Sequence, residues 1–233
     1  RAGVNWLSLH AIPDTNTIAR VFGTNLLPKG ASPATATRIS WYGGGTSNGQ
    51  PVTTIYLSNS NRWIYSLGGV GVADDINLSV NEGFVVELPS GSANHQIAVV
   101  GELTTNVLSQ TVYASNSINM LSATLPRRLR VRDLRLNEMG FRGAAAYNQF
   151  TKPDELRILS NTNGNGSMTS PRLRVWLNSS NTNYYDVDSG ANVNNRMIEP
   201  DEVLIWWNRG TSMQTWTIDP NDFYTKPSKN ISP

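Results

Sequence analysis

Residues 78–86 read LSVNEGFVV, and residues 197–205 read MIEPDEVLI. Each stretch passes through a polar segment into a run of apolar residues, which predicts a turn followed by a buried strand. The second stretch follows the first after about half the length of the chain. The pair indicates that one structural unit occurs twice.

Two further blocks repeat in the same order, with a spacing that drifts by only a few residues. A duplicated β-rich unit of roughly 115 residues has a normal domain size. We therefore expect Trp63 and Tyr184 to occupy equivalent places. The first block is NWLS at 5–8, followed by Pro13, and its match is NMLS at 119–122, followed by Pro126. The second block is VTTIYLSN at 52–59, followed by Trp63 and Tyr65, and its match is LRVWLNS at 173–179, followed by Tyr184 and Tyr185.

Short apolar strands punctuated by turns run through both copies, and no ten-residue helices lie between them. Helical spacing predicts short helices at Ile18–Phe22 and near Val131. The pattern predicts an all-β fold with short helices, built from two tandem, internally duplicated domains that each resemble a β-sandwich or barrel. We expect the first β-rich repeat at 1–105, a polar junction at 106–117, the second repeat at 118–225 and a C-terminal tail at 226–233.

The composition excludes several classes of protein. Charged residues make up 15% of the 233 residues, and polarity comes instead from Asn, Ser, Thr and Gly, which favour turns and β-surfaces. The absence of cysteine excludes disulfides and thiolate metal sites. No apolar run reaches the roughly 20 residues that span a bilayer. Because the sequence starts at Arg1 rather than methionine, we expect a processed, exported protein.

Positive charge is concentrated between residues 127 and 142, where six arginines lie among two carboxylates, although the net charge of the chain is only +2. The cluster is compatible with a polyanion-binding patch, a solvated face or a contact between subunits. It lacks the interleaved aromatic residues of single-strand binding proteins, so we expect no nucleic acid. In a subunit contact the arginines would face carboxylates of a neighbour, such as Asp74, Asp75, Asp219 or Asp222.

Catalytic signatures are weak. Residues 45–49 (GTSNG) match the nucleophile-elbow pattern, but a triple-glycine loop precedes them and Pro51 follows, which predicts a hairpin loop. His10 and His95 are the two histidines of the chain, and both lie in the first copy. We therefore expect no Ser-His-Asp triad, no enzymatic function and no cofactor.

One segment resembles a calcium loop. Asp186, Asp188 and Asn192 place oxygen donors at spaced positions along a turn. The distal bidentate glutamate of such loops is missing, and a turn rich in Asp, Gly and Asn needs no metal. We therefore predict no metal site. Asp186, Asp188 and Asn192 are the residues that would bind calcium if the turn did hold a metal.

Adjacent aromatic residues occur at three places, Trp41-Tyr42, Tyr184-Tyr185 and Trp206-Trp207. Neighbouring residues of a strand point to opposite faces of the sheet. If one ring of each pair fills a core, the other needs a covering element, a subunit partner or a ligand such as a sugar ring. Three pairs favour at least one functional aromatic surface.

The paired tyrosines and the segment Asn194–Ile205 resemble a family of exported, uncharacterised bacterial proteins of verrucomicrobia-like genomes. These proteins carry a YY…(A)N..I.PG.GF.V.R pattern, often in duplicate. Asn81–Val86 keeps the Gly-Phe step, whereas the second copy has Glu202-Val203 there. The resemblance covers roughly the second half of each repeat. It implies export and a duplicated β-rich fold, and it transfers no catalytic residue.

Three apolar segments, VTTIYLS, FVVEL and VLIWW, carry little or no charge. Proteins normally protect exposed strand edges with charge or proline. We therefore expect these strands to be edges that pair with another copy of the chain, by β-addition. The ends of the chain, Arg1–Leu9 and Thr225–Pro233, are the expected connectors.

The sequence thus predicts a structural subunit of an extracellular homopolymer, such as a cell-surface filament, fibre or layer. It would assemble through β-edge, terminal and aromatic contacts, without nucleic acid and without a membrane span. Two alternatives stay open: an exported carbohydrate-binding module that takes surface glycans, and a viral or phage structural protein. The predicted contact residues are Arg1, Trp6, Arg127, Arg128, Arg130, Tyr185, Trp207 and Tyr224.

Overall fold

The computed structural model describes the chain in eleven segments, and Tyr224 by its backbone alone. Within them lie fourteen strands and four short helical segments, so the predicted all-β class is confirmed. The helical segments are α1 (Ile18–Val21), η1 (Val131–Leu134), η2 (Leu136–Met139) and α2 (Asn221–Tyr224). The described residues are 3–9, 11–42, 50–80, 82–95, 101–103, 105–122, 127–148, 150–160, 171–180, 182–200 and 202–224.

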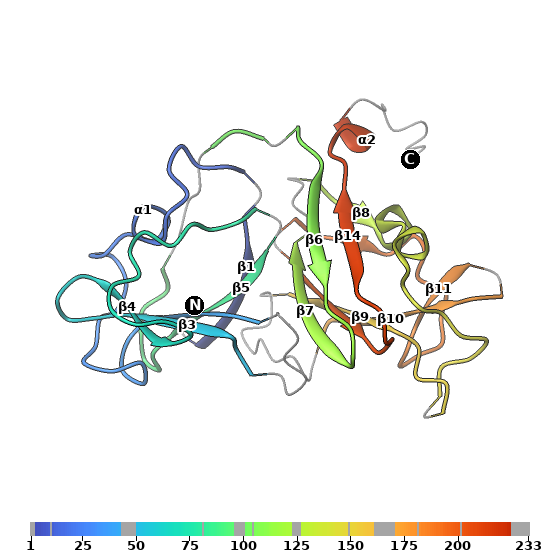
Figure 1. Cartoon of the computed structure of the whole chain (residues 1–233), viewed down its shortest axis with the longest axis horizontal. Helices are drawn as coiled ribbons and strands as arrows, with labels where there is room; N and C mark the ends of the chain where they lie inside the picture. Colours follow the sequence, from blue (N-terminus) through green and yellow to red (C-terminus); the bar gives the residue numbers. More distant parts are fainter. Residues whose placement is uncertain are drawn as a thin grey trace.

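Each half of the chain forms one antiparallel sheet of five strands (Figure 1). The sheet of the first half has the order β1 (Gly3–Ser8), β5 (Gly83–Leu88), β2 (Arg38–Trp41), β3 (Thr53–Leu57) and β4 (Trp63–Leu67). The sheet of the second half has the order β7 (Ser117–Ser122), β13 (Val203–Asn208), β9 (Glu155–Leu159), β10 (Leu173–Asn178) and β11 (Asn183–Asp186).

The two sheets have the same topology. In each sheet the first strand along the chain pairs with the last, the last also pairs with the second, and the second, third and fourth strands follow in order. Trp63 pairs with Leu57 in the first sheet, and Tyr184 pairs with Leu177 in the second. Both rings are buried in the core of their own half. The predicted equivalence of Trp63 and Tyr184 is confirmed.

Hydrogen bonds outside the strands repeat as well. The backbone N–H of Ile18 donates to the carbonyl of Ile76 at 2.9 Å, and that of Val131 donates to the carbonyl of Arg196 at 3.0 Å. These bonds attach α1 and η1 to the same place in each unit, and both helical segments bury their first residue. The duplication therefore extends to the helices that cover each core.

The register of the repeat differs by one residue from the match of LSVNEGFVV with MIEPDEVLI. Asn5 pairs with Val86, and Asn119 pairs with Trp206. Val86 thus corresponds to Trp206 and not to Ile205. A slip of one residue exchanges the two faces of a strand, and Val86 and Trp206 both point into the core of their own half.

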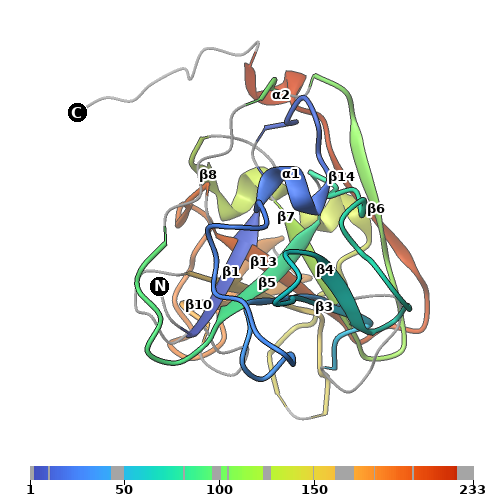
Figure 2. The ribbon, with the colours of Figure 1, turned by 90° about the vertical axis from the view of Figure 1, so that its left-hand side faces the viewer.

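The two sheets pack on each other through β1 and β5 of one and β7 and β13 of the other (Figure 2). Gly83 contacts Val203, its own counterpart, as happens beside a two-fold axis. A Cβ atom at position 83 would lie 2.7 Å from Cγ1 of Val203, so the close approach needs glycine. The shared core is built from Trp6, Val85, Met120, Leu159, Val203 and Ile205.

The predicted polar junction at 106–117 contains a strand. β6 (Leu108–Val112) pairs with β14 (Gln214–Ile218) in a separate two-stranded sheet beside the second half. Val112 is fully buried, whereas Ser109 and Thr111 are exposed. The polar residues that suggested a junction are therefore the solvent face of β6. A further two-stranded sheet joins β8 (Leu129–Arg130) to β12 (Met197–Ile198).

The three uncharged segments are interior strands, so the prediction that they form exposed edges is wrong. β3, β5 and β13 each have a neighbour on both sides, and burial within the sheet explains their lack of charge. The residues that follow the outer strands β4 and β11 fold back and accept backbone hydrogen bonds from them. Tyr65 N–H donates to the carbonyl of Gly71 at 3.1 Å, and Asp186 N–H donates to that of Ala191 at 2.9 Å. Neither sheet closes into a barrel.

Candidate functional site

The second sheet has a polar and aromatic face directed away from its core. Strand residues alternate between the faces, so Leu156 and Trp206 lie in the core while Glu155 and Trp207 lie on the opposite face. We call this surface the arginine–aromatic face. It consists of Tyr147, Glu155, Arg157, Arg174, Trp176, Tyr185, Trp207 and Arg209.

Glu155 lies at the centre of this face, and its side chain is fully buried. Its Oε1 atom accepts hydrogen bonds from Nε of Arg157 at 2.7 Å and from Nε of Arg174 at 2.9 Å. Its Oε2 atom accepts from the hydroxyl of Tyr147 at 2.7 Å and from Nη2 of Arg209 at 3.1 Å. Hydrogen bonds between charged partners are short and strong, so the carboxylate holds the three arginines in place.

The charges of the face are paired around Glu155 and Asp188. Burial raises the pKa of Glu155, but hydrogen bonds from Arg174 and Tyr147 and the charge of Arg157 outweigh it and lower that pKa to about 2. Asp188 adds a second carboxylate, 2.9 Å from Arg174. Glu155 and Asp188 therefore share the three guanidinium groups of the face.

The two adjacent tryptophans point to opposite faces, as the sequence predicts. Trp206 is fully buried, and its indole N–H donates to Asp154 at 3.0 Å. Trp207 is half-buried, with the guanidinium carbons of Arg157 and Arg209 each 4.5 Å from its ring centroid. The second ring thus lies against arginines of its own chain, at cation–π distance.

The predicted contact residue Tyr185 also lies on this face. Its ring centroid is 5.6 Å from that of Trp176, which is 6.1 Å from that of Tyr147. Tyr185 and Tyr147 are half-buried, whereas Trp176 is 8% exposed. The face therefore brings together two of the predicted residues, Tyr185 and Trp207.

The equivalent face of the first half has different chemistry. Arg38 corresponds to Glu155 and Glu87 to Trp207 by strand register, and the two form one ion pair at 2.6 Å. Ser40 and Thr54 stand where the second half has Arg157 and Arg174, and their hydroxyls are 3.0 Å apart. The arginine–aromatic face is therefore a property of the second half, laid on a framework that both halves share.

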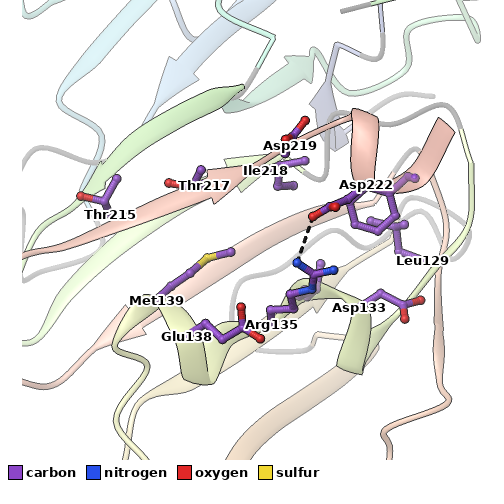
Figure 3. Close-up of a pocket in the computed structure, with 12 residues that line it drawn as sticks. Leu129, Asp133, Arg135, Glu138, Met139, Thr215, Thr217, Ile218, Asp219 and Asp222 are labelled. Carbon is purple, nitrogen blue, oxygen red and sulfur yellow. Dashed lines mark hydrogen bonds and ion pairs between the residues drawn. The ribbon is translucent and has the colours of Figure 1, made fainter. Parts of the chain in front are cut away.

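A groove lies on the other side of the second core, between η1, η2, β14 and α2 (Figure 3). Its volume is about 290 Å³. Arg135 crosses it to pair with Asp222 at 2.9 Å (Figure 3). We call it the acidic groove, because its apolar lining of Leu129, Leu134, Met139, Ile218 and Phe223 is joined by the carboxylates of Asp133, Glu138, Asp219 and Asp222.

The arginine cluster that precedes the groove is largely neutralised within the chain. Arg128 pairs with Glu199 at 2.7 Å, and Arg130 pairs with Asp133 at 2.9 Å. Arg127 donates to the backbone carbonyl of Phe223. Tertiary contacts thus supply these three arginines with partners in the same chain, and their role in a contact between subunits stays a prediction.

The remaining predicted contact residues do not form a surface. Trp6 is 3% exposed, in the core that joins the two sheets, so its prediction as a contact between chains is wrong. Arg1 lies outside the described residues, as do Thr225–Pro233 and the side chain of Tyr224.

The three candidate calcium ligands already have hydrogen-bond or ion-pair partners in the chain. Asp186 accepts from the hydroxyl of Ser189 at 2.6 Å and from the N–H of Asp188 at 3.1 Å. Asp188 pairs with Arg174, and Asn192 accepts from the N–H of Asn194 at 3.0 Å. Across the described segments, no group of three or more His, Cys, Asp or Glu residues could hold a metal ion.

The nucleophile-elbow pattern at 45–49 and His10 both lie outside the described residues. His95 follows β5 on a segment without regular structure, at the end of the described stretch. The absence of an enzymatic function stays a prediction.

Sequence reasoning missed Glu155, Arg209 and Phe150. Glu155 and Arg209 are separated by about fifty residues, and only the pairing of β9 with β13 brings them together. Phe150 is 86% exposed, which no periodic pattern signals because it lies in a loop. The sequence did contain one signal for Glu155. It is a charged residue within a stretch expected to form a strand, and a charge that is buried there needs partners.

Comparison with protein-family models, curated proteins and solved structures found no match. None of the helices in the described part of the chain is long and apolar enough to cross a membrane.

Proposed function

We propose that this chain is a structural subunit of an extracellular homopolymer, and that the arginine–aromatic face is a surface through which its copies meet. The composition of that face carries the proposal. Trp, Tyr and Arg are the residue types that supply most of the binding energy in protein contacts. Here Glu155 holds the arginines in one geometry, which reduces the entropy lost when a partner binds.

The mode of assembly that we propose differs from the one expected from the sequence. The outer strands β4 and β11 already have backbone partners, so simple strand addition at those two edges has no free donors at Tyr65 or Asp186. The arginines at 127–130 are engaged within the chain. We therefore place the contacts between copies on side chains of sheet faces and loops rather than on β4 and β11. The extracellular location rests on the sequence resemblance.

The test is the size of the protein as a function of concentration, by sedimentation velocity and negative-stain microscopy. We expect wild type to form polymers, and Tyr185→Ala to weaken association by about tenfold or more, because an aromatic anchor is lost. The matched control is Tyr56→Ala on the equivalent face of the first half, which should assemble as wild type does. A wild-type chain that stays monomeric at its highest soluble concentration would overturn the proposal.

Binding of surface glycans is the second candidate function, favoured by the aromatic rings beside the arginines of this face. This chemistry suits acidic sugars rather than neutral ones. A monomeric chain that binds an acidic polysaccharide through Tyr185 would favour this alternative. A viral or phage structural protein would also self-associate, and microscopy would then show closed shells in place of filaments or layers.

A further inference from the structure

The two-stranded sheet of β6 and β14 differs from the two large sheets, because each of its strands has a single neighbour among the described residues. Figure 2 shows this ribbon along the rim of the molecule. The side of β14 that faces away from β6 is covered by η2, and Gly140, directly after η2, lies against the side chain of Gln214. The outer side of β6 is therefore the edge of the ribbon to consider.

The hydrogen bonds of Tyr113 show which backbone groups of β6 point outward. Its N–H donates to Oδ1 of Asn119 at 2.8 Å, and its carbonyl accepts from Nδ2 of Asn119 at 3.1 Å, so both groups point away from β14. Residues of an antiparallel strand alternate between pointing these groups toward the partner and away from it. Thr111, two residues earlier, therefore also points its N–H and C=O away from β14.

Thr111 lies on an accessible stretch of this edge. The residue is exposed, and within the described part of the chain no group bonds its outward N–H or C=O. The edge is closed at both ends, because the amide of Asn119 takes the place of a strand at Tyr113, and Asn221 donates to the carbonyl of Thr105 at 3.0 Å. The accessible stretch is thus short and lies in the middle of β6.

The sequence does not protect this edge. Exposed strand edges normally carry charge or proline, whereas β6 has neither, and no charged residue occurs between Glu102 and Arg127. The lack of charge in β3, β5 and β13 is explained by neighbours on both sides. That explanation does not apply to β6, whose Ser109 and Thr111 are exposed.

The occupant that fits such an edge is another β-strand, since a strand offers N–H and C=O groups at the matching spacing. A second copy of β6 has the same edge. Antiparallel pairing about a two-fold axis would place the outward groups of one copy opposite those of the other. The side chains that meet would be small and uncharged, such as Ser109 and Thr111, so no like charges would face each other.

We propose that two copies of the chain pair through β6 and join their ribbons into one four-stranded antiparallel sheet, in the order β14, β6, β6 and β14. The inference rests on the proposed homopolymer and adds a second contact to it. A self-complementary contact alone stops at a dimer. Combined with the contact at the arginine–aromatic face, it lets pairs of copies follow one another in an open polymer.

Proline at position 111 provides the sharpest test. Proline lacks the N–H group, and an edge strand tolerates it where that group faces solvent, so Thr111→Pro should fold but not pair. Thr215→Pro is the matched control, because the N–H of Thr215 points away from β6 on the side that η2 covers. Thr111→Lys is a second variant, which keeps the backbone and places a charge at the edge of each copy.

By sedimentation velocity, wild type and Thr215→Pro should polymerise, and both variants at position 111 should associate about tenfold or more weakly. Tyr185→Ala, which weakens the other contact, should stop at a dimer. The double variant of Thr111→Pro with Tyr185→Ala should be monomeric. These four results together assign one contact to β6 and another to the arginine–aromatic face.

A spin label tests the position of the contact directly. The chain has no cysteine, so Thr111→Cys carries a single label. In the assembled protein its spectrum should show dipolar broadening, and dilution with unlabelled chain should remove it. The same label in Val70→Cys, at an exposed position of the first half, should show none.

Association of both position-111 variants equal to that of wild type, or a labelled polymer without broadening, would overturn the β6 contact and leave the homopolymer in place. Wild-type dimers that never grow longer, and that Thr111→Pro abolishes, would overturn the homopolymer and support the contact. A wild type that stays monomeric at its highest soluble concentration would overturn both. Thermal unfolding of Thr111→Pro beside Thr215→Pro establishes that lost assembly does not reflect lost folding.

Discussion

Glu155 controls the arrangement of the arginine–aromatic face at the scale of single residues. It is the fully buried carboxylate to which Arg157, Arg174 and Arg209 all donate. Without its negative charge, three guanidinium groups would be held close together with mutual repulsion. The residue therefore stabilises the fold and also keeps the proposed contact surface in one conformation.

Glu155→Gln should lower the free energy of unfolding by about 3 kcal/mol, because breaking a buried ion pair leaves uncompensated charge. Urea denaturation followed by tryptophan fluorescence measures the change. Asp188→Asn is the matched control, since its side chain is 65% exposed and a surface pair contributes less than about 1 kcal/mol. Equal effects of the two variants would show that Glu155 is not the centre of the network.

The depressed pKa of Glu155 predicts a specific dependence of stability on pH. The group contributes stability above its unperturbed pKa of 4.5, and this contribution disappears as the pH falls through its folded value of about 2. The full contribution is about 3 kcal/mol. The difference in unfolding free energy between wild type and Glu155→Gln should therefore shrink between pH 5 and pH 2. A difference that stays constant over this range would contradict the assignment.

At the scale of elements, the contact between β5 and β13 explains why the two copies differ in sequence where they meet. Gly83 and Val203 occupy equivalent positions and touch each other, so the side chain of one fills the space that the other leaves empty. Two valines could not both fit at the 2.7 Å approach found here. The loss of the Gly-Phe step in the second copy is thus a packing adaptation.

Gly83→Ala should destabilise the protein by about 1–3 kcal/mol through overpacking. Val203→Ala should cost less in the Gly83→Ala background than in wild type, because the shortened side chain makes room for the new methyl group. A double-mutant cycle in urea should give a coupling free energy of about 0.5 kcal/mol or more. Strictly additive effects would contradict direct contact between these two positions.

At the scale of the whole molecule, the two halves form an internal pseudo-dimer. Trp6 and Val85 of the first half share a core with Met120 and Ile205 of the second. The surface that would join two separate copies of the unit is therefore already used within the chain. Any further assembly has to use other surfaces, such as the arginine–aromatic face and the outer edge of β6.

The shared core predicts that the halves unfold together. Tryptophan fluorescence and far-UV circular dichroism should give coincident transitions in urea, and the calorimetric and van't Hoff enthalpies should agree. Trp6→Ala should lower stability by about 3–5 kcal/mol, because it opens a cavity in that core. Two resolved transitions in wild type would mean that each half is stable without the other.

Much of the fold follows from patterns that are local in the sequence. The repeated blocks predict two copies of one β-rich unit, and the period of two in strands predicts that Trp206 and Trp207 point to opposite faces. Both features depend on neighbouring residues and on order along the chain, so they can be inferred before any strand pairing is known.

Charge partners and exposed edges depend on contacts between distant segments. Arg128 reaches Glu199, and Glu155 gathers donors from β9, β10 and the start of the loop after β13. A list of charges along the chain cannot show which are already neutralised, and an uncharged strand looks the same whether it lies inside a sheet or at its edge. The sequence by itself determined the duplicated all-β unit, while the tertiary structure decided which surfaces stay open, because strand pairing and sheet packing bring together residues that are far apart in the chain.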